Sequence, residues 1–330
     1  LIELIPEYEK EVFGRRGLDS GSIIVGLGST EQTAAIFRLI LDPGDEIILT
    51  TPGYLNHKRQ VELETGLKAR IKYWRLLDGS TFSPSLDELN TLITNRTKAI
   101  LIISPGNPDG QVWDDKLLKG VHDLAMDHDF YVLIDVAYRA FIFGETPESF
   151  QRSPLEREIW ICSFSKEFRA PGWRISYLVL PEDLVRPLNT IEQARVLAPV
   201  SPIQLVLIKL FSDDDALRRL RDAYKHGSIR YEKMAMESVK VLSEMDGIKV
   251  LEPKGGFYVF FNVEEITPDD KKLWRELIDK KQLAFAPGSD FNGARGWIRL
   301  SFAPIIETPE KLREGLDRLR EYIEEVKSSS

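Results

Sequence analysis

The chain has 330 residues, of which 43% are hydrophobic, and its longest apolar runs are strand-sized, which argues against a membrane protein. Its net charge of −8 and isoelectric point near 5.3 argue against a nucleic-acid partner, because nucleic-acid-binding surfaces are normally basic. One cysteine excludes an internal disulfide framework and favours a reducing, cytoplasmic location, and four scattered histidines show no metal-ligand spacing.

Short apolar segments alternate with helical segments in the first half of the chain. An uncapped helix is expected over residues 3–13, and strands are expected over 22–25, 46–50, 70–73, 99–103, 131–135, 159–163 and 175–180. Helices between these strands are expected over 31–41, 85–92 and 114–128. Several of the strands are apolar nearly throughout, as in sheets covered on both faces. This alternation predicts an α/β fold with a mostly parallel central sheet and flanking helices.

The pattern changes after Pro202. Residues 203–245 are expected to be largely helical, with a break at the three aspartates 213–215. Strands are then expected over 249–251, 257–262, 284–286 and 297–302, followed by a final helix over 309–327. We therefore predict two domains, a large ligand-binding domain over residues 1–220 and a smaller α+β domain over residues 221–330.

Polar side chains follow the ends of several expected strands. They are Ser29 and Thr30, Tyr54, Asn107, Asp135 with Tyr138, and Lys166. In open α/β sheets, ligands bind beyond the carboxyl ends of the strands. The sequence therefore predicts one ligand site at this edge of the sheet.

Each of these groups, taken alone, has an ordinary structural explanation. The small residues 28–30 suit a phosphate at a helix N-terminus, although a simple helix cap is the commoner role. Asp135 either needs a partner for a buried carboxylate or caps the next segment. Lys166 is either a solvated surface lysine or a buried amine whose lowered pKa makes it a nucleophile toward aldehydes.

Eight motifs occur in order along nearly the whole chain: GLGSTEQ (26–32), LDPGDEIILTTPGY (41–54), SPGNPDG (104–110), LIDVAY (133–138), SFSKEFRAPGWR (163–174), PKGGFYVF (253–260), APGSDF (286–291) and IRLSFA (298–303). Ser163 precedes Lys166 by three residues, and Arg174 follows it by eight. Together the motifs and this spacing resemble the class I and II aminotransferases, which are fold-type I enzymes that use pyridoxal 5'-phosphate (PLP).

The resemblance implies a catalytic role for three side chains. Lys166 would form a Schiff base with PLP and later act as the base that moves the substrate's α-proton. Asp135 would keep the pyridine nitrogen protonated, supported by His57, so that the ring accepts electrons. Tyr138, together with Asn107, would hydrogen-bond the ring's phenolic oxygen.

The remaining implied contacts bind the cofactor and the substrate. Tyr54 would stack on the ring. Arg299 and Asn107 would bind the substrate, with Arg299 holding its carboxylate. The phosphate would be held by Ser29, Thr30, Ser163 and Arg174. The resemblance thus implies an aminotransferase that moves an amino group between an L-amino acid and a 2-oxo acid.

The resemblance also carries expectations about assembly. It implies a homodimer with both active sites at the subunit interface. Because the chain opens on Leu1 inside an expected helix, we expect the N-terminal arm that covers the site in family members to be missing here.

Four residues depart from the family pattern: Asp109, Val136, Arg169 and Ser176. Arg169 replaces a common glycine, and it is expected to add charge near the cofactor. The same set of motifs serves other PLP enzymes, so a carbon–sulfur β-lyase, a decarboxylase or an oxidase stays open as an alternative. A non-catalytic regulatory module is a further alternative, disfavoured by the intact Lys166 and Asp135.

Overall fold

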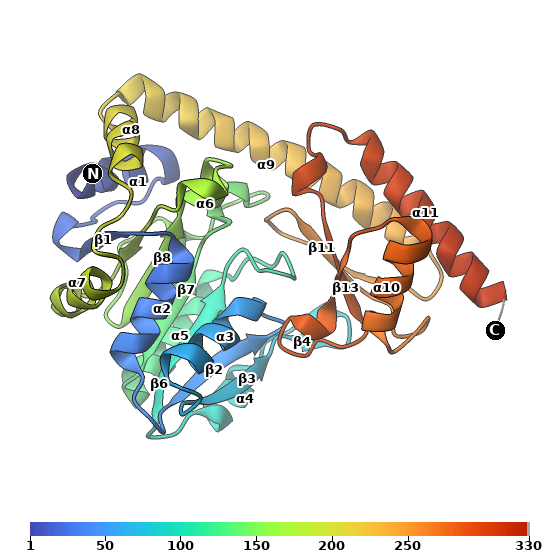
Figure 1. Ribbon diagram of the computed structural model, residues 1–330, viewed down its shortest axis with the longest axis horizontal. Helices are drawn as coiled ribbons and strands as arrows, with labels where there is room; N and C mark the ends of the chain where they lie inside the picture. The colour runs from blue at the N-terminus through green and yellow to red at the C-terminus, as the bar shows by residue number, and fades with distance from the viewer. Residues whose placement is uncertain (329–330) are drawn as a thin grey trace.

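The computed structural model describes residues 1–328 and contains two main sheets joined by one long helix (Figure 1). The larger sheet has seven strands in the order β1-β9-β8-β7-β6-β2-β3. Its strands are β1 (Ile23–Gly26), β2 (Glu46–Thr51), β3 (Arg70–Arg75), β6 (Thr97–Ile103), β7 (Tyr131–Asp135), β8 (Glu158–Ser163) and β9 (Ser176–Val179). Pairing is parallel from β3 through β8, and β9 runs antiparallel to both of its neighbours. The predicted α/β fold is confirmed.

Helices flank this sheet and connect its strands. They are α1 (Ile5–Phe13), α2 (Ser29–Ile40), α3 (Leu55–Glu64), α4 (Leu86–Leu92), α5 (Asp115–His128), α6 (Phe164–Glu167), α7 (Glu182–Val196) and α8 (Ser201–Phe211). Side-chain caps begin three of them, since Ser85 accepts from the Glu88 N–H, Asp114 from the Leu117 N–H and Ser163 from the Ser165 N–H. The uncapped start predicted for the first helix is also present, since Leu4 precedes α1 without a side-chain cap.

The smaller sheet is antiparallel, with the strand order β10-β11-β13-β12. Its strands are β10 (Lys249–Leu251), β11 (Tyr258–Asn262), β12 (Ala286–Pro287) and β13 (Trp297–Ser301), and α10 (Asp270–Lys281) and α11 (Glu310–Ser328) lie beside it. Helix α9 (Asp214–Ser243) runs from the large sheet to the small one (Figure 1). The domain boundary predicted after residue 220 falls inside α9, and it stays a prediction.

Several elements differ from the sequence-based expectation. The strand expected over 284–286 is β12, displaced toward Pro287, because only two residues there pair with β13. A short hairpin of β4 (Leu77–Asp78) and β5 (Thr81–Phe82) was not predicted, and neither were α3, α7 and α10. Helix α7 contains Pro187, and the sequence of α3 is mostly polar, so neither carries a clear amphipathic signal.

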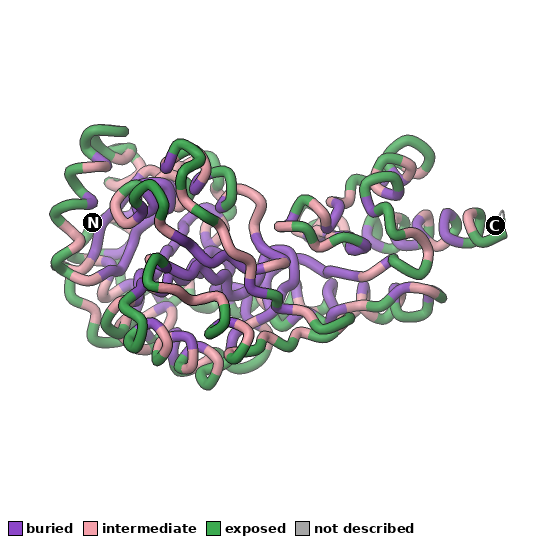
Figure 2. The backbone as a smooth tube through the Cα atoms, turned by 90° about the horizontal axis from the view of Figure 1, so that it is seen from below, coloured by how far each residue is buried: buried purple, intermediate pink, exposed green. Residues whose placement is uncertain are grey.

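The buried part of the chain follows the strands of both sheets, whereas the outer helical turns are exposed (Figure 2). Strands β1, β7 and β8 are buried at nearly every position, as expected for strands covered on both faces. Within residues 1–328, no helix combines the length and the apolar character that a membrane crossing requires.

Glu46, at the start of β2, is a buried carboxylate at the opposite end of the strand from Tyr54. It accepts hydrogen bonds from Thr94 Oγ1 at 2.6 Å and Arg96 Nη2 at 3.1 Å, and Lys72 Nζ lies 2.7 Å away. Burial alone would raise the pKa of this carboxylate, but these three donors lower it from 4.5 to about 2. The charged form is therefore stabilised by folding.

We predict that Glu46→Gln lowers the free energy of unfolding by about 1–3 kcal/mol at pH 7. The folded-state pKa lies below the unfolded value, so the parent's advantage is complete above pH 4.5 and fades as the pH falls toward 2. Denaturant unfolding of both proteins at pH 7 and at pH 3 measures this. Equal stabilities at pH 7 would contradict it, and turnover serves as a control that should not change.

Candidate active site

A pocket of about 350 Å³ lies at the carboxyl edge of the large sheet. All ten residues predicted to form the site line it: Ser29, Thr30, Tyr54, Asn107, Asp135, Tyr138, Ser163, Lys166, Arg174 and Arg299. Pockets for small ligands are typically about 300 Å³ or larger. The structure thus brings together side chains from segments that are up to 270 positions apart, while their individual roles remain predictions.

The parallel sheet explains most of this convergence. Asp135 is the last residue of β7, and Lys166 lies in α6 directly after β8. Asn107 and Tyr54 follow β6 and β2 in the same way. Because neighbouring parallel strands end at the same edge, their following loops meet there. Arg299 is different, since it reaches the pocket from β13 of the small sheet.

Asp135 is a buried carboxylate with few partners that stabilise its negative charge. Its Oδ1 accepts a hydrogen bond from the Ala137 N–H at 3.0 Å, and its Oδ2 lies 3.7 Å from His57 Nε2. Burial lowers the pKa of His57 to about 3, so that ring is neutral at pH 7. Burial also raises the pKa of Asp135 to about 6, and the charge of Lys166 opposes this only in part. Asp135 is therefore suited to a cationic partner supplied by a ligand.

Lys166 is an amine with a lowered pKa. Burial is the largest cause, and the positive charges of Arg299 and Arg174 add to it, whereas Asp135 opposes them. Its Nζ lies 5.9 Å from the centroid of the Phe257 ring. A lower pKa leaves a larger share of the amine uncharged at neutral pH, and the uncharged amine is the nucleophilic form.

Hydrogen bonds link three further polar groups of the pocket. Asn107 Nδ2 donates to the Tyr138 hydroxyl at 3.0 Å, and Arg299 Nη1 donates to Asn107 Oδ1 at 2.7 Å. The Arg299 guanidinium lies 4.4 Å from the centroid of the Tyr258 ring. Its Nε is buried and has no hydrogen-bond partner within residues 1–328. Arg299 therefore keeps donor capacity for an anionic ligand.

An anion-binding corner lies at the start of α2. Gly28 is the N-cap, with φ of 89°, and Ser29 and Thr30 form the first turn, where a helix presents unpaired N–H groups. A Cβ on Gly28 would lie 2.2 Å from Arg174 Nη2, so a glycine is required for the guanidinium to approach the helix. The same guanidinium donates to the Pro171 carbonyl at 2.8 Å. This corner suits a phosphate group.

Two further hydroxyl-bearing residues line the pocket besides the predicted ones. They are Ser165 and Tyr258, and both lie in motifs that the sequence had singled out. Arg169 is not among the lining residues, because its guanidinium pairs with Glu307 at 3.4 Å. In this orientation the Arg169 guanidinium faces Glu307, and the expectation that it adds charge near the cofactor stays a prediction.

The other departures from the family pattern are accommodated within the structure. Asp109 is buried, its Oδ1 accepts from the Gln111 N–H at 3.0 Å, and burial raises its pKa to about 7. Ser176 is buried and donates to Gln32 at 2.5 Å. Neither residue lines the pocket.

Comparison with known proteins identifies the family. The sequence profile of aminotransferase class I and II matches residues 2–319, nearly the whole chain. The chain belongs to this family. A probable aspartate/prephenate aminotransferase of Aquifex aeolicus is 30% identical over 92% of this chain and 76% of its own length. An aspartate aminotransferase of Pyrococcus horikoshii is 29% identical over 98% of this chain and 81% of its own length.

Solved structures of aminotransferases share the fold. An aromatic aminotransferase of Pyrococcus horikoshii superposes with a TM-score of 0.88 at 27% identity, over 99% of this chain and 86% of that one. The aspartate aminotransferase of Thermus thermophilus with maleate has a TM-score of 0.85 at 26% identity, over 97% of this chain and 80% of that one. The protein is an aminotransferase, which decides among the alternatives that the motifs alone left open.

The pKa of Asp135 leads to a prediction about stability. Because the folded-state pKa of about 6 exceeds the ordinary 3.8, this group costs stability as the pH rises from about 4 to 6. Asp135→Asn should therefore stabilise the cofactor-free protein above pH 6 by up to about 3 kcal/mol, with no gain below pH 4. Thermal unfolding across pH 4–8 tests this. A variant less stable than the parent at pH 8 would overturn the assignment of an uncompensated charge.

Proposed function

We propose that this aminotransferase binds PLP in the pocket at the carboxyl edge of the large sheet. The residues present fit that group in three ways. The start of α2 and Arg174 suit its phosphate, and the buried Asp135 suits a protonated ring nitrogen. The Lys166 amine, whose pKa is lowered, suits its aldehyde. The observation that carries the proposal is the meeting of Lys166 and Asp135 in one pocket.

The cofactor supplies an aldehyde for the amine and a ring that withdraws electrons from the substrate's α-carbon. Asp135 would supply the anion that holds a protonated ring nitrogen, since the neutral His57 does not offset its charge. Tyr138 and Asn107 present a hydroxyl and an amide on the same side of the pocket. Tyr54 lines the pocket and offers a ring that can stack.

Lys166 and Arg299 act on the substrate. The uncharged Lys166 amine accepts the α-proton and returns it, which is the proton movement that transamination requires. The donor capacity of Arg299, including its unpartnered Nε, holds the substrate carboxylate. An L-amino acid thereby gives up its amino group, and a 2-oxo acid then receives it.

We predict that borohydride treatment of the PLP-loaded protein fixes the cofactor covalently on Lys166. Peptide mapping by mass spectrometry locates the adduct, and Lys72→Ala is the control that should leave the adduct in place. Lys166→Ala should lower turnover of an L-amino acid with a 2-oxo acid by at least about 100-fold, since it removes the proton acceptor. An adduct on another lysine would refute the role of Lys166.

We also propose that two copies of the chain form a homodimer. Segment 197–206, between α7 and the middle of α8, exposes four large apolar side chains: Leu197, Val200, Leu205 and Val206. Leu197 is 80% exposed and Leu205 is 66% exposed. Exposed large apolar side chains grouped in one segment favour a protein–protein contact. The cytoplasmic location suggested by the single cysteine stays a prediction.

Leu205→Glu should weaken the dimer by at least about tenfold, because each subunit would bury an unpaired charge. Sedimentation equilibrium measures the dissociation constant. The matched control is Met126→Glu on α5, which changes an exposed apolar residue outside the segment and should leave the dimer intact. A parent protein that is monomeric at micromolar concentration would contradict the homodimer itself.

A further inference from the structure

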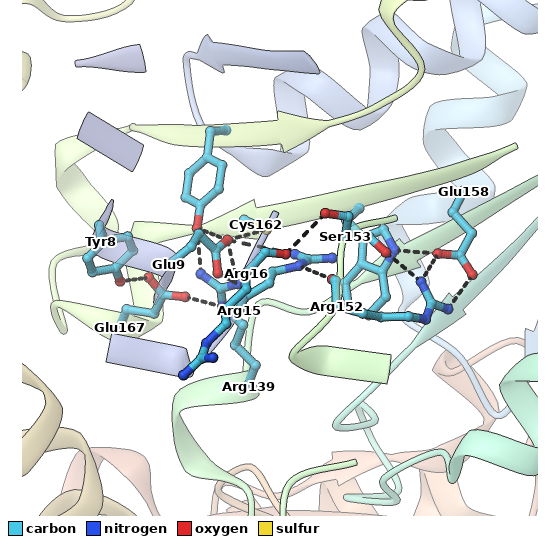
Figure 3. Close-up of polar contacts among 12 residues, drawn as sticks. Tyr8, Glu9, Arg15, Arg16, Arg139, Arg152, Ser153, Glu158, Cys162 and Glu167 are labelled. Carbon is cyan, nitrogen blue, oxygen red and sulfur yellow. Dashed lines mark hydrogen bonds and ion pairs between the residues drawn. The ribbon is translucent and has the colours of Figure 1, made fainter. Parts of the chain in front are cut away.

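Buried charged side chains form a cluster within the large domain (Figure 3). Arg139 Nε donates to Glu167 Oε1 at 2.9 Å, and Arg139 Nη1 donates to both oxygens of Glu9 at 2.8 and 2.9 Å. The Tyr8 hydroxyl donates to Glu167 Oε2 at 2.6 Å. Each of these side chains is at most 6% exposed. We call this group the Glu9–Arg139–Glu167 cluster.

Two members of the cluster are the immediate chain neighbours of pocket residues. Glu167 follows Lys166 and is the last residue of α6, while Arg139 follows Tyr138 and begins a 3₁₀ turn. Helix α6 has only four residues, too few for its own hydrogen bonds to hold it in place. The Arg139–Glu167 ion pair therefore joins the backbone beside the pocket amine to the backbone beside the pocket phenol.

Glu9 anchors this pair to the rest of the large domain. It lies on α1, and it also accepts from the Tyr177 hydroxyl at 2.6 Å, while Arg15 Nη1 lies 3.7 Å away. Burial opposes the charge of Glu9, but Arg139 and Arg15 together lower its pKa below the ordinary value. The cluster thus binds α1, β9 and α6 into one unit.

Stability alone is a weak reason for such a cluster. Replacing a buried ion pair by well-packed apolar residues is often neutral or stabilising, because desolvation offsets the attraction. Unlike an apolar contact, a hydrogen-bonded ion pair fixes the orientation of both side chains. The fixed partners here are the residues next to Lys166 and Tyr138.

We propose that Glu167 and Arg139 are positioning residues for the amino-transfer reaction. Their ion pair holds the turn that carries Lys166 against the turn that carries Tyr138, so that the amine and the phenol face the same ligand. This inference rests on the proposed function, in which Lys166 is the reacting amine. A reacting group displaced by about 1 Å can lose about 100-fold in rate.

The test compares two variants that make the same change in two buried carboxylates. Glu167→Gln weakens the pair with Arg139. The matched control is Glu158→Gln at the start of β8, where the carboxylate pairs with Arg152 at 2.8 and 2.9 Å and accepts from Trp160 Nε1 at 3.0 Å. Glu158 is also buried and lies on the strand that leads to Lys166, but its neighbours in the sequence do not line the pocket. Figure 3 shows Glu158 with Arg152.

Three measurements separate positioning from stability. In Glu167→Gln, hydrogen exchange of residues 163–169 in the cofactor-free protein should speed up at least about tenfold. In the PLP-loaded protein, the pH midpoint of the visible absorbance should shift by about half a unit or more, and kcat should fall about 10- to 100-fold. Glu158→Gln should lower the melting temperature while leaving all three at parent values.

If Glu167→Gln does not fold, Tyr8→Phe removes one hydrogen bond to Glu167 and should change the same three measurements in the same direction by less. Equal behaviour of the Glu158 and Glu167 variants overturns the positioning role and leaves the proposed function intact. If the parent does not carry PLP on Lys166, the proposed function is overturned. Hydrogen exchange in the cofactor-free protein then still decides whether the Arg139–Glu167 ion pair holds the turn that carries Lys166.

Discussion

The burial of charged groups at the carboxyl edge of a parallel sheet is the constraint on which the site depends. Asp135 closes a strand that is buried along nearly its whole length, so its carboxylate is largely shielded from water. The same burial lowers the pKa of Lys166 and holds His57 neutral. A buried charge in that position lowers the stability of the protein until a ligand supplies a partner. An ordinary protein interior pairs its buried charges internally, whereas a binding site leaves one for the ligand.

The two groups of buried charge in the large domain are arranged in opposite ways. In the Glu9–Arg139–Glu167 cluster, each carboxylate meets a guanidinium and a phenol, so its hydrogen-bonding capacity is used within the protein. In the pocket, Asp135 and the Nε of Arg299 keep unused capacity. A paired cluster next to an unpaired site lets the first stay rigid while the second remains available to a ligand.

Some of this organisation could be predicted from residue order. Apolar strands alternating with helices indicate a parallel sheet, and that topology places the residues after β2, β6, β7 and β8 at one edge. The spacing of Ser163, Lys166 and Arg174 indicated the family that the comparisons then confirmed. Elements without a periodic signal, such as α7 with its internal proline, could not be recognised in this way.

Residue order determines which side chains can meet, because the local pattern sets strand, helix and turn, and the parallel topology sets the shared edge. It does not determine how far a charge is desolvated or which way a long side chain turns. Only the tertiary structure showed that Arg169 faces Glu307 rather than the pocket, and that Glu167 beside the reactive lysine pairs with Arg139. Burial and ion pairing depend on neighbours that are remote in sequence, and those neighbours are defined only when the chain is folded.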